Sequence, residues 1–168
     1  MEIKYKIDKP DNFSKEDKDH FLSLLIKQKQ VEKPNLKNIN SCPFICIAYV
    51  DNVAIGIGAI KQIYKTPFDS AGVKELKDTF EFEIGYLFID NESDSNNYRG
   101  FGIGKAITHL LLKKVEDQNV FATTELNINN RMMHILKSYG FESFGVPYRG
   151  KETNKLISLM LLSRAKTN

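Results

Sequence analysis

Apolar and polar residues alternate along several stretches of the chain, and this alternation predicts β-strands. The same stretches carry many β-branched and aromatic side chains, which favour extended backbone. They cover residues 2–7, 44–50, 53–63, 80–90, 120–126, 141–146 and 154–162. Asp51 and Asn52 separate two of them, and a two-residue linker of this kind closes a β-hairpin. We therefore expect residues 44–50 and 53–63 to pair as a hairpin.

Between these strands, apolar residues recur every three or four positions, which predicts amphipathic helices. A first helix follows Ser14, whose side chain caps it in a capping-box variant with Asp17. A second helix covers residues 103–118, and a third lies in residues 129–139 and stops at Gly140. Residues 31–43 are expected to form a loop or a broken helix. Residues 64–79 are too irregular for the pattern to define an element.

The order of these elements predicts the fold class. The strand at 80–90, the helix at 103–118 and the strand at 120–126 form a βαβ unit, so the two strands should be parallel neighbours in a mixed sheet. A chain of 168 residues with 42% hydrophobic residues is long enough for one buried core and short for two domains. We expect a single domain over residues 1–168.

Composition and charge exclude some classes of function. The 24 basic and 21 acidic residues are spread along the chain and give a net charge of +3, which falls short of a nucleic-acid-binding surface. No apolar run approaches the ~20 residues that cross a bilayer. Residues 1–10 lack the apolar stretch of a secretory signal. These observations predict a cytoplasmic protein with neither a nucleic-acid nor a membrane partner.

Cysteine and histidine residues do not form a recognisable metal-binding pattern. Cys42 and Cys46 lack a second Cys or His cluster, and a reducing cytosol disfavours a disulfide, so both are expected to be free thiols, buried or partly buried. The histidines, His20, His109 and His134, occur singly on predicted helices without ligand spacing. We therefore expect no metal.

The stretch YRGFGIGKAI, residues 98–107, has glycines at alternate positions directly before a helix. Glycine loses more conformational freedom on folding than any other residue, so we expect a tight turn or a ligand against the main chain. The N–H groups and partial positive charge of a helix N-terminus suit a phosphate. Arg99 and Ala106 break the Walker A pattern, and Lys105 breaks the dinucleotide-binding pattern. Close packing at the helix N-terminus without any ligand also explains the glycines alone.

One motif in this loop has a match. Arg99-x-x-Gly102-x-Gly104 has the form Arg/Gln-x-x-Gly-x-Gly/Ala. Between a strand and a helix, it resembles the acetyl-CoA pyrophosphate loop of the GNAT (general control-related N-acetyltransferase) superfamily. The order of elements along nearly the whole chain is similar to that fold. The segment from Asn129 to Phe141, an Asn that opens a helix ending in Gly-Phe, resembles a later motif of the family.

The resemblance implies an α/β (α+β) fold with a mixed, mostly antiparallel sheet, a splayed central pair of parallel strands and helices on both faces. It also implies that acetyl-CoA is the cosubstrate. Main-chain groups of one central strand would bind the pantetheine arm, and N–H groups of the glycine loop would bind the pyrophosphate. The residues implied for cosubstrate binding are Leu87, Phe88, Ile89, Arg99, Gly100, Phe101, Gly102, Ile103, Gly104, Lys105, Asn129 and Arg131.

Acetyl transfer requires a neutral amine, whereas a lysine-type amine with a pKa of ~10.4 is almost wholly protonated at neutral pH. Glu83 is our candidate general base, directly or through a water, because it lies on the strand that leads to the loop and matches the family pattern. A glutamate that only faces solvent is the alternative. Glu81 is expected on the same face and could substitute for Glu83 or raise its pKa. A main-chain N–H near Leu87 is the expected oxyanion donor.

The usual general acid of the family is absent from this chain. Family members commonly have a tyrosine four residues before the Gly of the closing Gly-Phe, where this chain has Leu136. Tyr139 points in a different direction on the same helix. A water, Tyr86, Tyr98 or Tyr148 could protonate the thiolate, and each tyrosine also suits a packing role.

The function that we expect first is transfer of acetyl from acetyl-CoA to a primary amine of a small molecule or peptide. Its acceptor site would comprise the first helix, residues 31–43, residues 64–79 and the loop around Tyr148. A non-catalytic acyl-CoA-binding sensor or interaction module is the second hypothesis, and the missing tyrosine supports it. A nucleotide-binding protein is the third. The sequence leaves open whether the protein forms a homodimer.

Overall fold

Strand β4 (Phe82–Ile89) is shared by two groups of elements in the computed structural model, which describes residues 1–62, 65–92, 97–151 and 154–164. The other strands are β1 (Ile3–Asp8), β2 (Phe44–Val50), β3 (Val53–Lys61), β5 (Val120–Glu125), β6 (Glu142–Arg149) and β7 (Leu156–Leu162). They form a 7-stranded sheet with the order β1-β2-β3-β4-β5-β7-β6. β4 and β5 are parallel, whereas β1–β2, β2–β3, β5–β7 and β6–β7 are antiparallel. The predicted mixed sheet and its parallel pair are confirmed.

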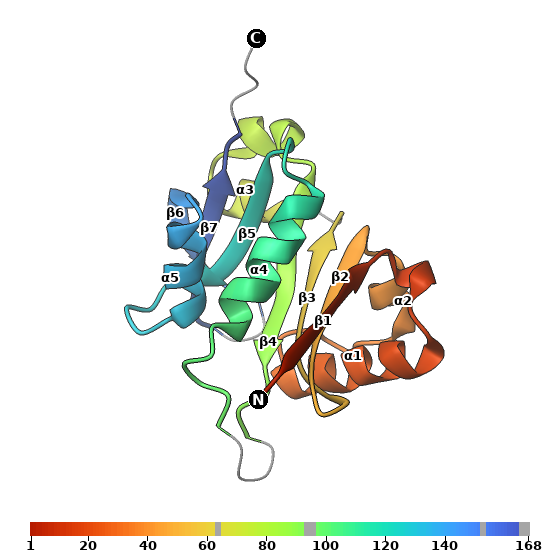
Figure 1. The fold of residues 1–168 in the computed structure, drawn as a ribbon. Helices are drawn as coiled ribbons and strands as arrows, with labels where there is room; N and C mark the ends of the chain where they lie inside the picture. The colour runs from red at the N-terminus through yellow and green to blue at the C-terminus, as the bar shows by residue number, and fades with distance from the viewer. Residues whose placement is uncertain (63–64, 93–96, 152–153, 165–168) are drawn as a thin grey trace. The chain divides into compact units, whose positions relative to one another are not determined.

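The helices connect these strands (Figure 1). They are α1 (Lys15–Gln28), α2 (Leu36–Asn40), α3 (Thr66–Ser70), α4 (Ile103–Lys114) and α5 (Arg131–Ser138), with 3₁₀ turns η1 (Pro10–Asn12) and η2 (Lys74–Thr79). None of the helices in the described part of the chain combines the length and the apolar composition of a membrane span.

The contacts divide the chain into two compact units. The first unit comprises residues 1–61 and 84–114, and the second comprises residues 62–83 and 115–168. The boundary falls inside β4, between Glu83 and Ile84, so each unit contains a part of this strand. We describe each unit by itself. The single domain over residues 1–168 stays a prediction.

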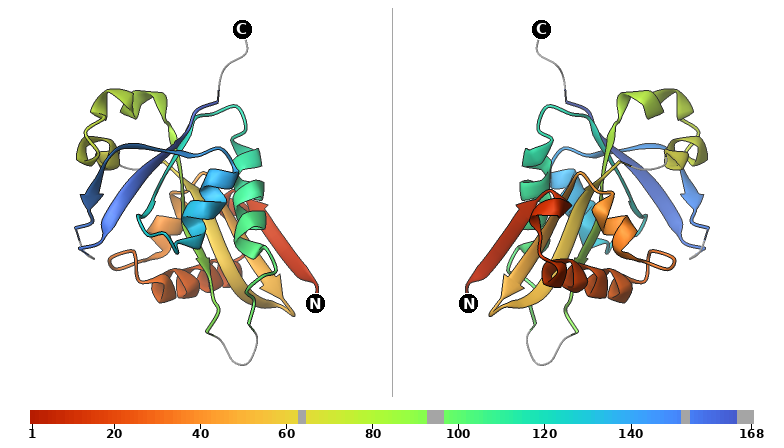
Figure 2. Two further views of the ribbon diagram at one scale, coloured as in Figure 1. Left: turned by 90° about the vertical axis from the view of Figure 1, so that its left-hand side faces the viewer. Right: turned by 90° about the vertical axis from the view of Figure 1, so that its right-hand side faces the viewer.

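In the first unit, α1 and α4 lie on opposite faces of β3 (Figure 2). Ile57 and Ala59 pack in the cluster of buried residues to which α1 contributes. Gly56 and Gly58 alternate with them and face α4, where a Cβ on Gly58 would lie only 2.7 Å from Cγ2 of Ile107. Because neighbouring residues of a strand point to opposite faces, this unit has helices on both faces of its strands, as expected.

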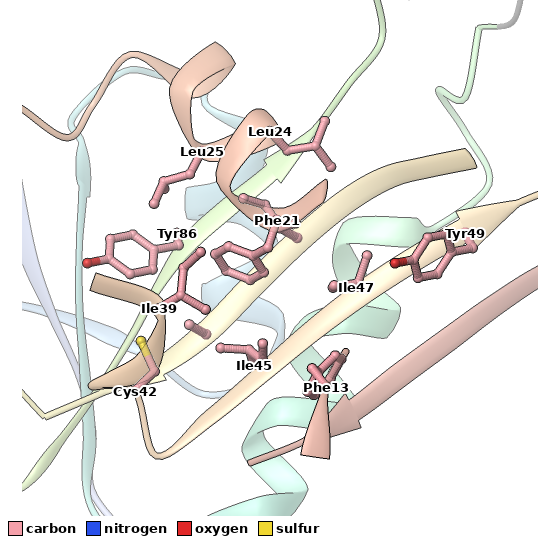
Figure 3. Packing of buried hydrophobic residues seen from close by; sticks show 12 residues of the cluster. Phe13, Phe21, Leu24, Leu25, Ile39, Cys42, Ile45, Ile47, Tyr49 and Tyr86 are labelled. Carbon is pink, nitrogen blue, oxygen red and sulfur yellow. The ribbon is translucent and has the colours of Figure 1, made fainter. Parts of the chain in front are cut away.

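The core of the first unit lies between α1 and the strands β2 and β3 (Figure 3). Phe21, Leu24 and Leu25 from α1 are buried against Ile45 and Ile47 from β2. Each such side chain stabilises the folded state by roughly 1.5–3 kcal/mol when fully buried. Helical spacing of the apolar residues therefore places α1 on the sheet.

Local signals in the first unit work as the sequence predicts. Ser14 Oγ accepts a hydrogen bond from the Asp17 N–H at 3.1 Å and caps α1. Asp51 and Asn52 have φ angles of +48° and +63° and join β2 to β3 as a hairpin. Both conformations are left-handed, which asparagine and aspartate tolerate better than most residues.

The second unit has a smaller core, formed mainly by aromatic residues. The Phe68 ring of α3 lies 5.0 Å from the Phe121 ring of β5 and 5.8 Å from the Phe80 ring, measured between centroids. This cluster also contains Leu159 and Leu161 of β7. α5 packs against β5 as well, and Asn130 Nδ2 donates to Thr124 Oγ1 at 2.7 Å.

The structure adds elements where the sequence pattern predicts none. α3 (Thr66–Ser70) and η2 (Lys74–Thr79) lie within the segment 64–79, and residues 63 and 64 lie outside the described residues. Burial of Phe68 stabilises α3 through tertiary contacts, which a local pattern does not reveal. In residues 31–43, where we expected a loop or a broken helix, the structure has the short helix α2, which begins with a capping box at Asn35.

Two helix ends differ from the prediction. α4 ends at Lys114 rather than at residue 118, although Val115 remains buried. α5 begins at Arg131, and Asn130 rather than Asn129 is its N-cap, with Oδ1 accepting from the Met132 N–H at 2.9 Å. Gly140, with φ +92°, follows α5 as its predicted C-terminal stop.

Both cysteines are free and buried, as expected. Burial raises the pKa of the Cys46 thiol to about 12, so this group stays protonated and unreactive near neutral pH.

Candidate active site

The glycine loop before α4 combines an unusual backbone with open space. Gly100 and Gly102 have φ angles of +85° and +69°, a region that other residues adopt only at a cost. A Cβ built on either glycine would meet no atom within 4 Å. The turn therefore explains the need for glycine, and the space beside these two residues is wide enough for a ligand to approach the main chain.

α4 begins directly after this turn. The Ala106 N–H donates to the Gly102 carbonyl at 2.9 Å, which starts the helical hydrogen-bonding pattern. The N–H groups of Ile103 and Gly104 precede the first residue that helix geometry can pair, and N–H groups at a helix N-terminus point in the direction from which an anion binds. Ile103 is buried and anchors the turn, whereas Arg99 and Lys105 are exposed cations. A helix N-terminus with cations beside it has the features of sites that bind phosphate groups.

Strand β4 changes its backbone conformation at Tyr86. This residue has a φ of +55°, which a non-glycine residue rarely adopts and which costs on the order of 1–3 kcal/mol. Its ring is held in the core, 6.4 Å from the Phe21 ring, with Lys61 Nζ 4.4 Å from its centroid. These contacts hold the strained backbone, and strained residues of this kind often occur at functional sites.

The end of α1 is tied to β4 immediately after Tyr86. Gln28 Nε2 donates to the Leu87 carbonyl at 3.1 Å, and Lys27 Nζ lies 2.7 Å from Oδ2 of buried Asp90. Gln28 Oε1 is buried and has no hydrogen-bond partner among the described residues. Nothing in the helix pattern distinguishes Gln28 from a solvated glutamine, so its contact with Leu87 could not be predicted from the sequence.

Leu87, Phe88 and Ile89 are half-buried. Side chains of Leu87 and Ile89 face the glycines of β3, and Phe88 packs against the core beneath α1. Because the side chains of these residues pack against other residues, a ligand would have to bind to their main-chain N–H and C=O groups.

In the second unit, Glu83 is buried, with 8% of its surface exposed. Burial and the negative charge of Glu83 raise the pKa of Tyr148 to about 12. A glutamate that only faces solvent would be exposed, so the burial of Glu83 contradicts that alternative.

Glu81 differs from Glu83. It is exposed and accepts a hydrogen bond from Gln62 Nε2 at 2.8 Å. Glu81 therefore lacks the burial that distinguishes Glu83.

Other predicted positions also lie in the second unit. Leu136 is fully buried and brings no hydroxyl group to the site. Asn129 and Arg131 are exposed. The neighbouring Asn130 is engaged as a helix cap and also donates to the Glu125 carbonyl at 2.6 Å.

Of the alternative tyrosines, Tyr86 and Tyr98 are buried, whereas Tyr148 is half-buried. Among the described residues, no group of three or more His, Cys, Asp and Glu side chains could hold a metal ion.

The acetyltransferase (GNAT) family model matches residues 5–141, which is most of the chain. This chain belongs to the GNAT family. Among curated proteins, none is significantly similar to it in sequence. The family assignment confirms the resemblance carried by the glycine loop, and GNAT enzymes are acyltransferases that use acetyl-CoA as cosubstrate.

Solved structures of other proteins share the fold. The NatC complex bound to Gag peptide and CoA is 20% identical, with a TM-score of 0.73 over 98% of this GNAT chain and 100% of the other. Escherichia coli ElaA is 12% identical, with a TM-score of 0.70 over 96% and 100%. Arabidopsis thaliana NAA60 in complex with acetyl-CoA is 14% identical, with a TM-score of 0.68 over 96% and 99%. At these identities the likeness concerns the fold.

Proposed function

We propose that this GNAT enzyme transfers the acetyl group of acetyl-CoA to a primary amine of a peptide or small molecule. The observation that carries the proposal is the turn of Gly100 and Gly102, which leaves open space at the N-terminus of α4. A diphosphate needs main-chain N–H donors without side chains in front of them, and this turn supplies that arrangement.

In this proposal the loop from Arg99 to Lys105 binds the pyrophosphate. Its main-chain N–H groups donate hydrogen bonds, and the exposed side chains of Arg99 and Lys105 add positive charge. Main-chain groups of Leu87, Phe88 and Ile89 bind the pantetheine arm. Asn129 and Arg131 complete the cosubstrate-binding residues, and their exposure in the second unit is compatible with a ligand contact.

The chemistry depends on β4. Glu83 takes a proton from the acceptor ammonium or from the attacking amine, directly or through a water. The N–H of Leu87 donates a hydrogen bond to the carbonyl oxygen as its negative charge develops. The bond from Gln28 to the Leu87 carbonyl supports this step, because it restrains the strand at the residue whose N–H is needed.

Two observations support an amine as acceptor. Gln28 Oε1 is a buried acceptor next to the Leu87 carbonyl, and an unpaired buried acceptor costs about 1–3 kcal/mol, which an N–H group of a substrate would offset. Two structures with a similar fold contain a peptide or a peptide analogue: NatC is bound to Gag peptide and CoA, and Arabidopsis thaliana Naa50 is in complex with the bisubstrate analogue CoA-Ac-MVNAL. Peptides with a free α-amine are therefore the first acceptors to test.

A thermal-shift series followed by a transfer assay tests this function. Acetyl-CoA at 100 times its Kd should stabilise the fold by about 2.7 kcal/mol, whereas ATP and NAD should not. Free thiol should then be released from acetyl-CoA only when a peptide or small amine is present. Stabilisation by acetyl-CoA without transfer to any amine would favour the non-catalytic sensor, which the buried Leu136 supports.

The sequence also predicts a cytoplasmic location and neither a nucleic-acid nor a membrane partner, and it leaves open whether the protein forms a homodimer. These stay predictions, and fractionation and sedimentation measurements test them.

A further inference from the structure

Phe101 occupies the middle of the glycine loop, between Gly100 and Gly102, and 55% of its surface is exposed. Single exposed hydrophobic residues are common on protein surfaces, so the exposure alone indicates no function. The place of Phe101 in the loop is more informative. Main-chain N–H groups can bind a diphosphate whatever side chain stands at this position. The aromatic ring is therefore not explained by the diphosphate site itself.

The loop holds Phe101 at the surface because the residues at its two ends are buried. Tyr98 and Ile103 are 7% and 2% exposed, whereas residues 99–102 between them are exposed. The Arg99 N–H also donates to Oδ1 of Asn97 at 3.1 Å, which supports the turn. The ring of Phe101 thus belongs to an exposed segment that is anchored on both sides.

The chain leaves space on both sides of Phe101. A Cβ built on Gly100 or on Gly102 would meet no atom within 4 Å. Neither neighbour along the chain has a side chain that could cover the ring. A planar group that approaches the loop therefore finds an exposed aromatic ring with open surroundings.

The charges next to Phe101 suit a nucleotide. Arg99 lies two residues before it and Lys105 four residues after it, and both side chains are exposed cations. In coenzyme A, the diphosphate joins the pantetheine arm to an adenosine that carries a 3′-phosphate, so the adenine base is one ribose away from the diphosphate. Aromatic side chains bind bases by stacking on their flat faces. A loop that binds the diphosphate therefore has the base within reach.

We propose that the ring of Phe101 stacks on the adenine base of acetyl-CoA. The inference rests on the proposed function, because it needs the diphosphate at the main-chain N–H groups of the same loop. The loop would then bind two parts of the cosubstrate by different means, the diphosphate through its main chain and the base through one side chain. Because a phenylalanine ring has no hydrogen-bonding group, it contacts the face of the base and not its edges.

Phe101→Ala in the full chain tests the inference by calorimetric titration, without any need for transfer. The Kd for acetyl-CoA should rise about tenfold, which is within the range for loss of an aromatic side chain that stacks on a base. Acetyl-3′-dephospho-CoA keeps the adenine and should show the same loss. S-acetyl-4′-phosphopantetheine lacks the adenosine and should bind the wild-type chain and the variant equally.

The control for this titration is Phe144→Ala, at an exposed phenylalanine of the second unit, which should keep the wild-type Kd for acetyl-CoA. An unchanged Kd for acetyl-CoA in Phe101→Ala would overturn the inference, and so would an equal loss for S-acetyl-4′-phosphopantetheine. If Phe101→Ala changes the sedimentation coefficient instead of the Kd, the ring belongs to a contact between copies of the chain and the inference is wrong.

Phe101→Trp gives a spectroscopic test, because the chain has no tryptophan of its own. The introduced indole keeps an aromatic ring in the loop, so the Kd for acetyl-CoA should stay within about twofold of the wild-type value. Stacking of the adenine should quench the indole fluorescence, whereas S-acetyl-4′-phosphopantetheine should not. Saturation with acetyl-CoA without quenching would overturn the inference, and the binding itself would still support the proposed function. Failure of the wild-type chain to bind acetyl-CoA would reject both.

Discussion

The two units use different parts of the polypeptide for their predicted tasks. The first unit offers main-chain groups: the turn at Gly100 and Gly102, the start of α4, and the strand from Leu87 onward. The second unit offers side chains, with buried Glu83 and half-buried Tyr148 on one face of its strands. Binding of a ligand by main-chain groups tolerates most substitutions of side chains. Catalysis by a side chain is lost when that one residue changes, as at position 136, where this chain has Leu136 instead of a tyrosine.

The largest effect is expected at the side chain of Glu83. Glu83→Gln removes the proposed base but keeps the size of the side chain, so kcat should fall by about 10²–10⁴-fold while acetyl-CoA binding is retained. Steady-state kinetics with saturating acetyl-CoA measure this loss. The control is Glu81→Gln at the exposed glutamate, which should keep wild-type kcat. A reversal, with Glu81→Gln inactive and Glu83→Gln active, would assign the base to Glu81.

The next effect tests a bulge in β6 between Phe144 and Tyr148, where the Val146 N–H donates to the Ala71 carbonyl at 3.0 Å. Gly145→Ala introduces a Cβ only 2.3 Å from the Ala71 carbonyl oxygen at a φ of +69°. We expect the free energy of unfolding to fall by about 2–4 kcal/mol through overpacking and backbone strain. Urea unfolding measures it. Val146→Ala changes only an exposed side chain of the same bulge and keeps the N–H donor, so it should change stability by less than about 0.5 kcal/mol. Similar losses in both variants would argue against the bulge contact.

A smaller effect is expected at the glycine loop. Gly102→Ala imposes a left-handed conformation on alanine, at a cost of about 1–2 kcal/mol, and places a methyl group in the proposed phosphate site. The KM for acetyl-CoA should rise about tenfold or more, and the KM for the amine should not change.

Gly72 provides the matched control for this loop. It has a φ of +74° and equally open surroundings, but it lies in the second unit and outside the proposed cosubstrate-binding residues. Gly72→Ala should therefore reduce stability by a similar amount without any effect on the KM for acetyl-CoA. If both variants raise the KM for acetyl-CoA equally, backbone strain rather than loss of phosphate binding explains the effect of Gly102→Ala.

The smallest effect concerns the tie between α1 and β4. Gln28→Met keeps the length of the side chain but loses the hydrogen bond to the Leu87 carbonyl, which should cost about 1 kcal/mol of stability. It also removes the buried Oε1, so the KM for the amine should rise several-fold. Gln30→Met, at an exposed position just after α1, is the control. Unchanged amine kinetics in Gln28→Met would limit Gln28 to a structural role.

Sequence reasoning succeeded where the cause is local. Ser14, Asp51–Asn52 and Gly140 act within a few residues, so their roles could be predicted before the fold was known. The glycine loop was also predicted, because its spacing and its place before a helix are visible in the chain.

Contacts between distant segments could not be predicted in this way. Phe68 stabilises α3 only because β5 brings Phe121 to it, and Gln28 meets Leu87 across 59 positions of sequence. The position of Glu83 and Tyr148 on one face of the strands likewise depends on the register of four strands. In these cases the residue type is ordinary and only its partner makes it informative.

Gly56 and Gly58 set the spacing between β3 and α4. A methyl group on Gly56 would lie 3.2 Å from Cδ1 of Ile107 of α4, and one on Gly58 would lie 2.7 Å from Cγ2 of the same residue. The absence of side chains at Gly56 and Gly58 thus determines the distance between α4 and β3. Gly102 directly precedes α4, so its position depends on that distance. We therefore expect substitutions at Gly56 or Gly58, more than forty positions upstream of Gly102, to change the affinity for acetyl-CoA although neither glycine belongs to the proposed cosubstrate site.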